Sequence, residues 1–292
     1  MKLRNPDFAL SVAAGFTLVL LAALLLYFAS RLFVADNYRL VLEALGGSAF
    51  WGAVAVGFLA QAVDGALGMA YGVTATTFLL SAGATPAMAS ASVHIAEIFT
   101  TGFSGISHLK FGNVNKQLFL RLLIPGMLGA ILGTIVITQL DGKMLRPYVT
   151  AYLLIMGAYI LSKAFRKLRA RAGEPRHVGK LAVFGGFVDA AGGGGWGPVV
   201  TSTLVGSGRD PRTTIGSVNF AEFFITVATA TSFSLLIGPS AWQLVAGLVL
   251  GGLCAAPFAA LLCKRLSARS LLVMVGALIV GLSAYNLYKS IF

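Results

Sequence analysis

The sequence predicts an all-α integral membrane protein, with about seven transmembrane helices and two broken-helix hairpins, built from two inverted repeats. Three observations predict this class. Of the 292 residues, 57% are hydrophobic and 11% are charged, whereas soluble domains carry about a quarter charged residues. Apolar runs of about 20 residues, enough to cross a bilayer, recur along the chain. A block in the first half also recurs in the second half.

The apolar runs give the expected membrane spans in chain order. The first run, 8–28, follows Lys2 and Arg4 and resembles a signal peptide, but its length indicates a retained helix. The later runs are 87–106, 118–137, 145–161, 241–263 and 271–287.

The net charge of +12 does not indicate a nucleic-acid partner. The 22 basic residues lie in short loops between apolar runs, where they orient the chain in the membrane. Cys254 and Cys263 are too far apart along one predicted helix to form a disulfide. Cysteines and histidines do not cluster at metal-ligand spacing, so neither a metal site nor another cofactor is expected.

Two segments of the chain align without a gap at an offset of 125 residues. Residues 63–101 match 188–226, and SVHIAE at 92–97 recurs as SVNFAE at 217–222. One ancestral unit is therefore expected to occur twice. The matched pairs include Asp64 with Asp189, Gly68 with Gly193, Gly72 with Gly197, Pro86 with Pro211, and Glu97 with Glu222.

The repeat divides the chain into four regions. The expected divisions are 1–47, an N-terminal transmembrane helix and connector; 48–165, the first repeat; 166–179, a basic cytoplasmic linker; and 180–292, the second repeat.

Each unit opens with an apolar stretch interrupted by small residues, FLAQAVDGALGMAYGV and FGGFVDAAGGGGWGPV. If each stretch is a re-entrant hairpin, a unit has three full spans, and an odd number inverts the second copy. With the N-terminus inside, 17 of the 22 basic residues then lie on the inner face, against 13 if each stretch crosses once. The positive-inside rule favours the hairpins and places the N-terminus and 163–180 in the cytoplasm of a multi-pass plasma (inner) membrane protein.

Four of the ten acidic residues fall at membrane depth: Asp64, Glu97, Asp189 and Glu222. Carboxylates in that position are functional candidates by default. Asp64 and Asp189 precede the glycine-rich breaks, where an aspartate can also cap a following half-helix, so both roles stay open. Glu97 and Glu222 lie in mid-helix, where capping does not apply, and are predicted to exchange protons.

Polar residues extend this pattern along one face of each predicted helix. Hydrogen bonding between helices explains the hydroxyl groups but explains the carboxylates poorly, so a wet central cavity is favoured. The first stripe comprises Ser90, His94, Glu97, Thr101, Ser104 and His108. The second comprises Asn219, Glu222, Thr226 and Thr229.

The glycine-rich breaks predict an anionic substrate. Free N–H groups where half-helices begin, with the positive end of the helix dipole, can hold an anion without a basic side chain. The alternative is that these glycines only allow helices to pack closely. The candidate residues are Gly65, Gly68, Tyr71 and Gly72 in the first unit, Gly193, Gly194, Gly195, Trp196 and Gly197 in the second, and His94 and Asn219 as additional polar contacts.

VDGALGMAYGV and VDAAGGGGWGP resemble the TauE/SafE family of membrane proteins, also called the toluene-sulfonate uptake permease family. The resemblance covers about residues 48–292 and both repeats. It implies transport of small sulfur-containing anions (sulfite, sulfoacetate or other organosulfonates), usually outward, and points to Asp64, Gly68, Tyr71, Gly72 and 193–198 as site segments. His94 is matched by Asn219, so the two halves differ chemically there.

We therefore expect a secondary transporter that exports a small sulfur-containing anion by alternating access, with Glu97 and Glu222 available for proton coupling. A passive anion channel and an uptake permease are the alternatives. An enzyme using Ser90 or Ser92 with His94 is disfavoured, because Asn219 breaks that pattern in the second unit. The expected partners are the substrate and the lipid bilayer. The sequence does not decide whether the protein forms a homo-oligomer.

Overall fold

The computed structural model describes residues 46–165, 177–237, 242–265 and 268–291, together with Val19 and Ala22. These ranges are helical and contain no strand, which confirms the all-α class. Two predicted regions lie largely outside the described residues. They are the span at 8–28, of which only Val19 and Ala22 are described, and the linker 166–179, of which only residues 177–179 are described.

The helices fall into two series with the same order. The first series is α3 (Ser48–Leu67), α4 (Tyr71–Ser81), α5 (Pro86–Lys110), α6 (Lys116–Gln139) and α7 (Gly142–Lys163). The second is α8 (Val178–Gly192), the π-helical turn η1 (Gly197–Thr201), α9 (Ser202–Gly206), α10 (Pro211–Ile237), α11 (Trp242–Arg265) and α12 (Ala268–Ile291).

Four described helices, α6, α7, α10 and α12, are long and apolar enough to cross a membrane. Equivalent helices start at nearly the same offset as the sequence repeat: α5 begins at Pro86 and α10 at Pro211. The number of crossings and the inverted insertion of the two series stay predictions.

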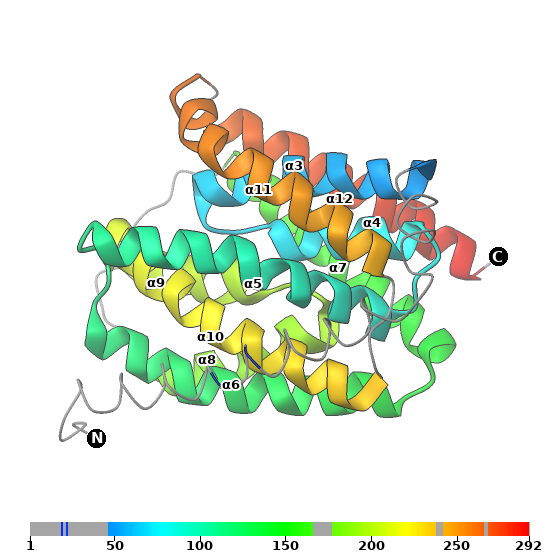
Figure 1. The fold of residues 1–292 in the computed structure, drawn as a ribbon, viewed down its shortest axis with the longest axis horizontal. Helices are drawn as coiled ribbons and strands as arrows, with labels where there is room; N and C mark the ends of the chain where they lie inside the picture. The colour runs from blue at the N-terminus through cyan, green and yellow to red at the C-terminus, as the bar shows by residue number, and fades with distance from the viewer. Residues whose placement is uncertain are drawn as a thin grey trace.

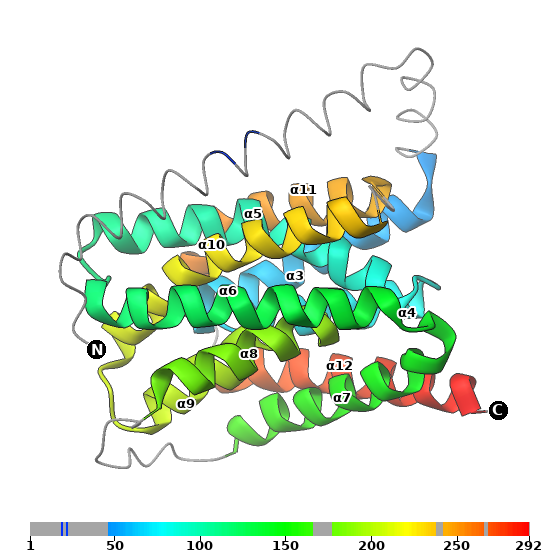
Figure 2. The same cartoon turned by 90° about the horizontal axis from the view of Figure 1, so that it is seen from below.

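The two series exchange their opening helices. Helix α3 packs on α11 of the second series, and α8 packs on α6 of the first. Helices α5 and α10 pack together between these pairs, and α7 packs on α12 (Figures 1 and 2). The packing of one half is therefore repeated by the other, and groups from both halves meet at the centre.

Glycines allow the exchanged helices to approach closely. A side chain at Gly129 or Gly186 would collide with backbone across the α6–α8 contact, and one at Gly57 or Gly251 would do so across α3–α11. Small residues at helix contacts are typical of membrane proteins. Close packing is thus the role of these glycines, which lie away from the two predicted breaks.

The central helices α5 and α10 begin with matched caps. The Met88 amide donates to Thr85 Oγ1 at 3.3 Å, and the Thr213 amide donates to Asp210 Oδ2 at 2.8 Å. A proline follows each cap at the first helical position, where its missing N–H costs nothing. The bond from the Thr213 amide also holds the pKa of Asp210 below its ordinary value.

Candidate functional site

Each interrupted stretch breaks at a glycine in the left-handed conformation. Helix α3 ends at Gly68 with φ 64°, and α8 ends at Gly193 with φ 71°. This region favours glycine because a β-carbon would be strained there. We call residues 68–70 break 1 and residues 193–195 break 2. Both breaks fall where the sequence predicts them, and α4 and η1 continue the chain beyond them.

The two aspartates cap the half-helices that follow the breaks. The Trp196 amide donates to Asp189 Oδ1 at 2.9 Å, and the Tyr71 amide approaches Asp64 Oδ1 at 3.4 Å. The structural role left open for these aspartates is therefore present. Since first-turn amides have no partner within their own helix, those of Gly72 and Gly197 are the candidates left for an anion.

The two breaks lie against each other at the centre of the molecule. A β-carbon on Gly72 would lie 2.7 Å from Gly194 Cα and 3.0 Å from Glu97 Oε1. One on Gly197 would lie 2.8 Å from Met69 Cα. The breaks can meet only because glycine occupies these positions, and their contact brings the Glu97 carboxylate to the backbone of α4.

A small cavity lies at this meeting point, with a volume of about 10 Å³. That is room for about one water molecule. All four carboxylates predicted from the sequence line it, although they come from four different helices. Its lining comprises Asp64, Met69, Ala70, Tyr71, Gly72, Val73, Glu97, Asp189, Gly195, Trp196, Gly197, Pro198 and Glu222.

Five of the remaining predicted site residues do not line this cavity. They are Gly68, His94, Gly193, Gly194 and Asn219. Gly65, the sixth, lies outside the residues whose surroundings the structure describes. Of the four carboxylates, Glu97 and Asp189 are buried, and Asp64 and Glu222 are half-buried. Glu97 Oε2 has no hydrogen-bond partner.

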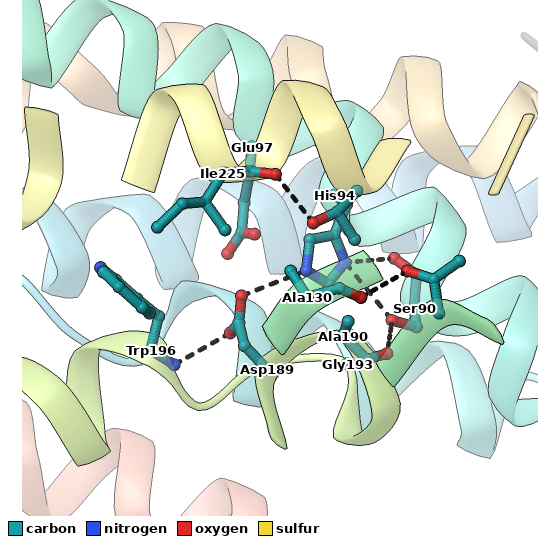
Figure 3. A network of polar contacts seen from close by, with 12 residues as sticks. Ser90, His94, Glu97, Ala130, Asp189, Ala190, Gly193, Trp196 and Ile225 are labelled. Carbon is teal, nitrogen blue, oxygen red and sulfur yellow. Dashed lines mark hydrogen bonds and ion pairs between the residues drawn. The ribbon is translucent and has the colours of Figure 1, made fainter. Parts of the chain in front are cut away.

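His94 connects the two halves instead of lining the cavity (Figure 3). Its Nε2 lies 3.2 Å from Asp189 Oδ2, and its Nδ1 lies 2.8 Å from the Ser90 carbonyl oxygen. A carbonyl oxygen only accepts, so Nδ1 carries a proton and donates. The contact between Nε2 and the carboxylate then requires one further proton between them.

Ser90 and His94 do not form a nucleophile facing the cavity. The Ser90 hydroxyl donates to the Ala190 carbonyl oxygen at 2.6 Å and lies 3.3 Å from His94 Nδ1. Neither Ser90 nor Ser92 lines the cavity. The order Ser90–His94–Asp189 thus serves as a hydrogen-bonded connection between α5 and α8.

Break 2 is hydrogen-bonded to helices of the first series. The Thr76 hydroxyl donates to the Gly193 carbonyl oxygen, and the Tyr152 hydroxyl donates to the Gly194 carbonyl oxygen at 2.6 Å. We call these contacts, with those of Ser90 and His94, the break-2 junction. Thr76 and Tyr152 are not among the site residues predicted from the sequence. The matched pair Thr76 and Thr201 in the repeat was a signal for the first, whereas Tyr152 has no such signal.

The equivalent contact of break 1 with the second series lacks these bonds. Thr201 Oγ1, the repeat partner of the Thr76 hydroxyl, has no hydrogen-bond partner, and neither has Asn219 Oδ1 beside Gly68. The Asn219 amide group donates to Ser104 at 3.1 Å instead. Ile215 also packs on Gly68. We call the contact of break 1 with Thr201, Ile215 and Asn219 the break-1 junction.

Comparison with known proteins shows to which family the chain belongs. The profile of the sulfite exporter TauE/SafE family matches residues 53–286. The chain belongs to the TauE/SafE family. It is also 44% identical, over 242 residues and 80% of each chain, to a probable membrane transporter protein, YtnM, of Bacillus subtilis (strain 168). No solved structure matches it. The family resemblance is confirmed, and this TauE/SafE protein is a membrane transporter.

Proposed function

We propose that this TauE/SafE transporter exports a small sulfur-containing oxyanion, such as sulfite or the organosulfonate sulfoacetate, by alternating access. One observation carries the proposal: the beginnings of α4 and η1 meet at a cavity that is lined by repeat-paired groups from both halves. Central sites between paired broken helices are a recurring design of secondary transporters.

The anion would be held by backbone amides. Those of Gly72 and Gly197 begin half-helices whose positive dipole ends favour negative charge. Tyr71 and Trp196 form matching walls. The cavity lining contains no Lys or Arg, so the carboxylates of Glu97 and Glu222 must be neutral or ion-paired when an oxyanion is present.

The cavity volume supports an alternating mechanism. Space for about one water molecule is too little for a sulfur atom with three oxygens. The site must therefore widen to load and to release, and each junction would open in turn. A passive channel would instead need a continuous open path.

Export needs little additional driving force. An inside-negative potential supplies about 2.3 kcal/mol per charge per 100 mV to an anion that leaves the cell. Uptake against that potential requires a coupled proton or cation, for which the cavity carboxylates are the available groups. The response of flux to imposed voltage and pH gradients therefore tests both the direction of transport and its coupling to protons.

The test is flux of radiolabelled sulfite, sulfoacetate and taurine in proteoliposomes, with and without imposed pH and voltage gradients. We expect saturable flux of at least one of these anions, and strong loss of flux in Glu97→Gln and Glu222→Gln proteins that stay folded. Absence of flux for all three would reject the substrate class. Normal, pH-independent flux in the double variant would reject proton coupling by the two glutamates.

A further inference from the structure

Lys163 ends α7, and its side chain reaches the central breaks. Its ammonium group donates to the Ser202 hydroxyl of α9 and lies 3.5 Å from Met69 Sδ in break 1. Figure 2 shows the end of α7 near α9, at the end of the molecule where the linker begins. The sequence alone assigned Lys163 only to the basic residues that orient the chain.

The Lys163 ammonium has no carboxylate partner among the described residues. It is half-buried, its hydroxyl partner Ser202 is buried, and the Tyr159 ring centroid lies 5.1 Å from it. A cation withdrawn from water is costly unless an opposite charge compensates it. The described surroundings of Lys163 supply polar and aromatic contacts but no negative charge, so they favour a bound anion.

Only one side chain separates Lys163 from the central cavity. Met69 lines that cavity and at the same time contacts the ammonium group. Its Cα packs on Gly197 of η1, so it lies between the two half-helices. Methionine is unbranched and has three rotatable side-chain bonds. Rotation of this side chain would therefore clear the path from Lys163 to the cavity when the break-1 junction opens.

This path lies at the less firmly bonded junction. Met69 belongs to break 1, whose contacts with the second series lack the hydrogen bonds of the break-2 junction. Opening the break-1 junction exposes the cavity toward Lys163 and Ser202. Both lie at the linker end of the molecule, which the distribution of basic residues predicts to be cytoplasmic.

We propose that Lys163 and Ser202 form a peripheral anion-binding site, which receives the oxyanion at the linker-side mouth before Met69 admits it to the central cavity. The proposal rests on the proposed function and adds the first binding step to it. The ammonium group supplies the charge that the cavity lining lacks, and the Ser202 hydroxyl supplies a second donor.

A lysine at a helix end can also simply extend to the membrane surface and help to orient the chain. Lys180 separates these two roles. It lies two residues after the start of α8 and is exposed. Lys163 precedes the linker in the sequence, and Lys180 follows it. Lys180→Gln removes the same charge from the same end of the protein, and no hydrogen bond joins Lys180 to Met69 or Ser202.

The first test measures the KM for radiolabelled sulfite from each side, in vesicles of both orientations. We expect Lys163→Gln to raise the linker-side KM about tenfold, as for loss of one charge-assisted hydrogen bond, with Vmax and the opposite-side KM little changed. Lys163→Arg should restore much of the affinity, and Lys180→Gln should leave it unchanged. An unchanged KM in Lys163→Gln, or an equal rise in Lys180→Gln, would overturn the proposal.

The second test does not depend on transport. In a protein carrying Ser202→Cys, Cys254→Ala and Cys263→Ala, the new thiol is labelled with an anionic and with a cationic methanethiosulfonate of similar size. We expect the anionic reagent to react about tenfold faster than the cationic one, and Lys163→Gln to abolish that preference. Equal preference with and without Lys163 would reject the site even if the wild type transports sulfite. If the protein shows no sulfite flux but the labelling preference depends on Lys163, only the proposed substrate is rejected.

Discussion

The break-1 and break-2 junctions have the same backbone design but differ in their hydrogen bonds. Each has a left-handed glycine, Gly68 or Gly193, and an aspartate that caps the next half-helix. At break 2, side chains of the first series donate to the break and pair with its aspartate. At break 1, the equivalent hydroxyl and amide oxygens of the second series have no partner.

This difference shows that two copies of one backbone arrangement can be joined to their neighbours by different hydrogen bonds. His94 at one junction is matched by Asn219 at the other, and only histidine can pair with the opposing aspartate through a shared proton. We infer that the break-2 junction is the firmer of the two in this conformation.

Asp189→Asn should destabilise the protein much more than Asp64→Asn. The first change leaves the buried His94 without its charged partner, at an expected cost of about 3 kcal/mol. The second weakens only the long capping contact to the Tyr71 amide, at a cost of about 1 kcal/mol. Thermal unfolding of both variants in the same detergent measures the difference, and equal losses would show that the His94 contact adds no stability.

His94→Asn makes the two junctions chemically alike and should cost about 2 kcal/mol, as for a hydrogen bond to a charged group. Thermal unfolding of this variant beside the wild type measures the loss. An unchanged melting temperature would contradict a stabilising contact between His94 and Asp189.

Gly193→Ala should be more harmful than Gly68→Ala. Both substitutions force alanine into the left-handed region, at a cost of about 1 kcal/mol each. The new methyl group at position 68 also meets Ile215 Cγ2 at 2.9 Å, at the end of a side chain that can shift. The new methyl group at position 193 also collides with the Thr76 side chain and displaces its hydroxyl from the Gly193 carbonyl oxygen, which should add about 1 kcal/mol. Gly206→Ala, where open space surrounds the added carbon, is the control. A greater loss at position 68 would reverse the ranking of the junctions.

Thr76→Val should cost about 1 kcal/mol, because the hydroxyl bond to break 2 is lost while the shape is kept. Thr201→Val should be neutral or slightly stabilising, since it removes a buried hydroxyl that has no partner. Chemical unfolding of the two variants checks this smallest difference. Similar losses at both positions would indicate that Thr201 is bonded in solution and that the junctions are equally firm.

Much of the site follows from patterns along the chain. The offset of 125 residues pairs Asp64 with Asp189 and Glu97 with Glu222, and all four line one cavity. The glycine breaks were also predictable, because glycine adopts the left-handed conformation of Gly68 and Gly193 and allows close backbone approach more readily than other residues. The inverted insertion and the proton-coupling role of the glutamates stay predictions.

Other features depend on which side chains meet in space. His94 was expected at the substrate, but it pairs with Asp189, 95 positions away, and does not line the cavity. Tyr152 and Lys163 lie on a helix without a polar pattern, so nothing in the sequence singled them out.

The sequence by itself determined the membrane class, the repeat, the two breaks and the four carboxylates. These depend on composition and on local backbone preferences, which act over a few residues. Only the tertiary structure decided that break 2 accepts side-chain hydrogen bonds that break 1 lacks at the equivalent position. A hydrogen bond between helices forms or fails over differences of about 1 Å in the distance between donor and acceptor, and a pattern repeated along the chain does not determine that distance.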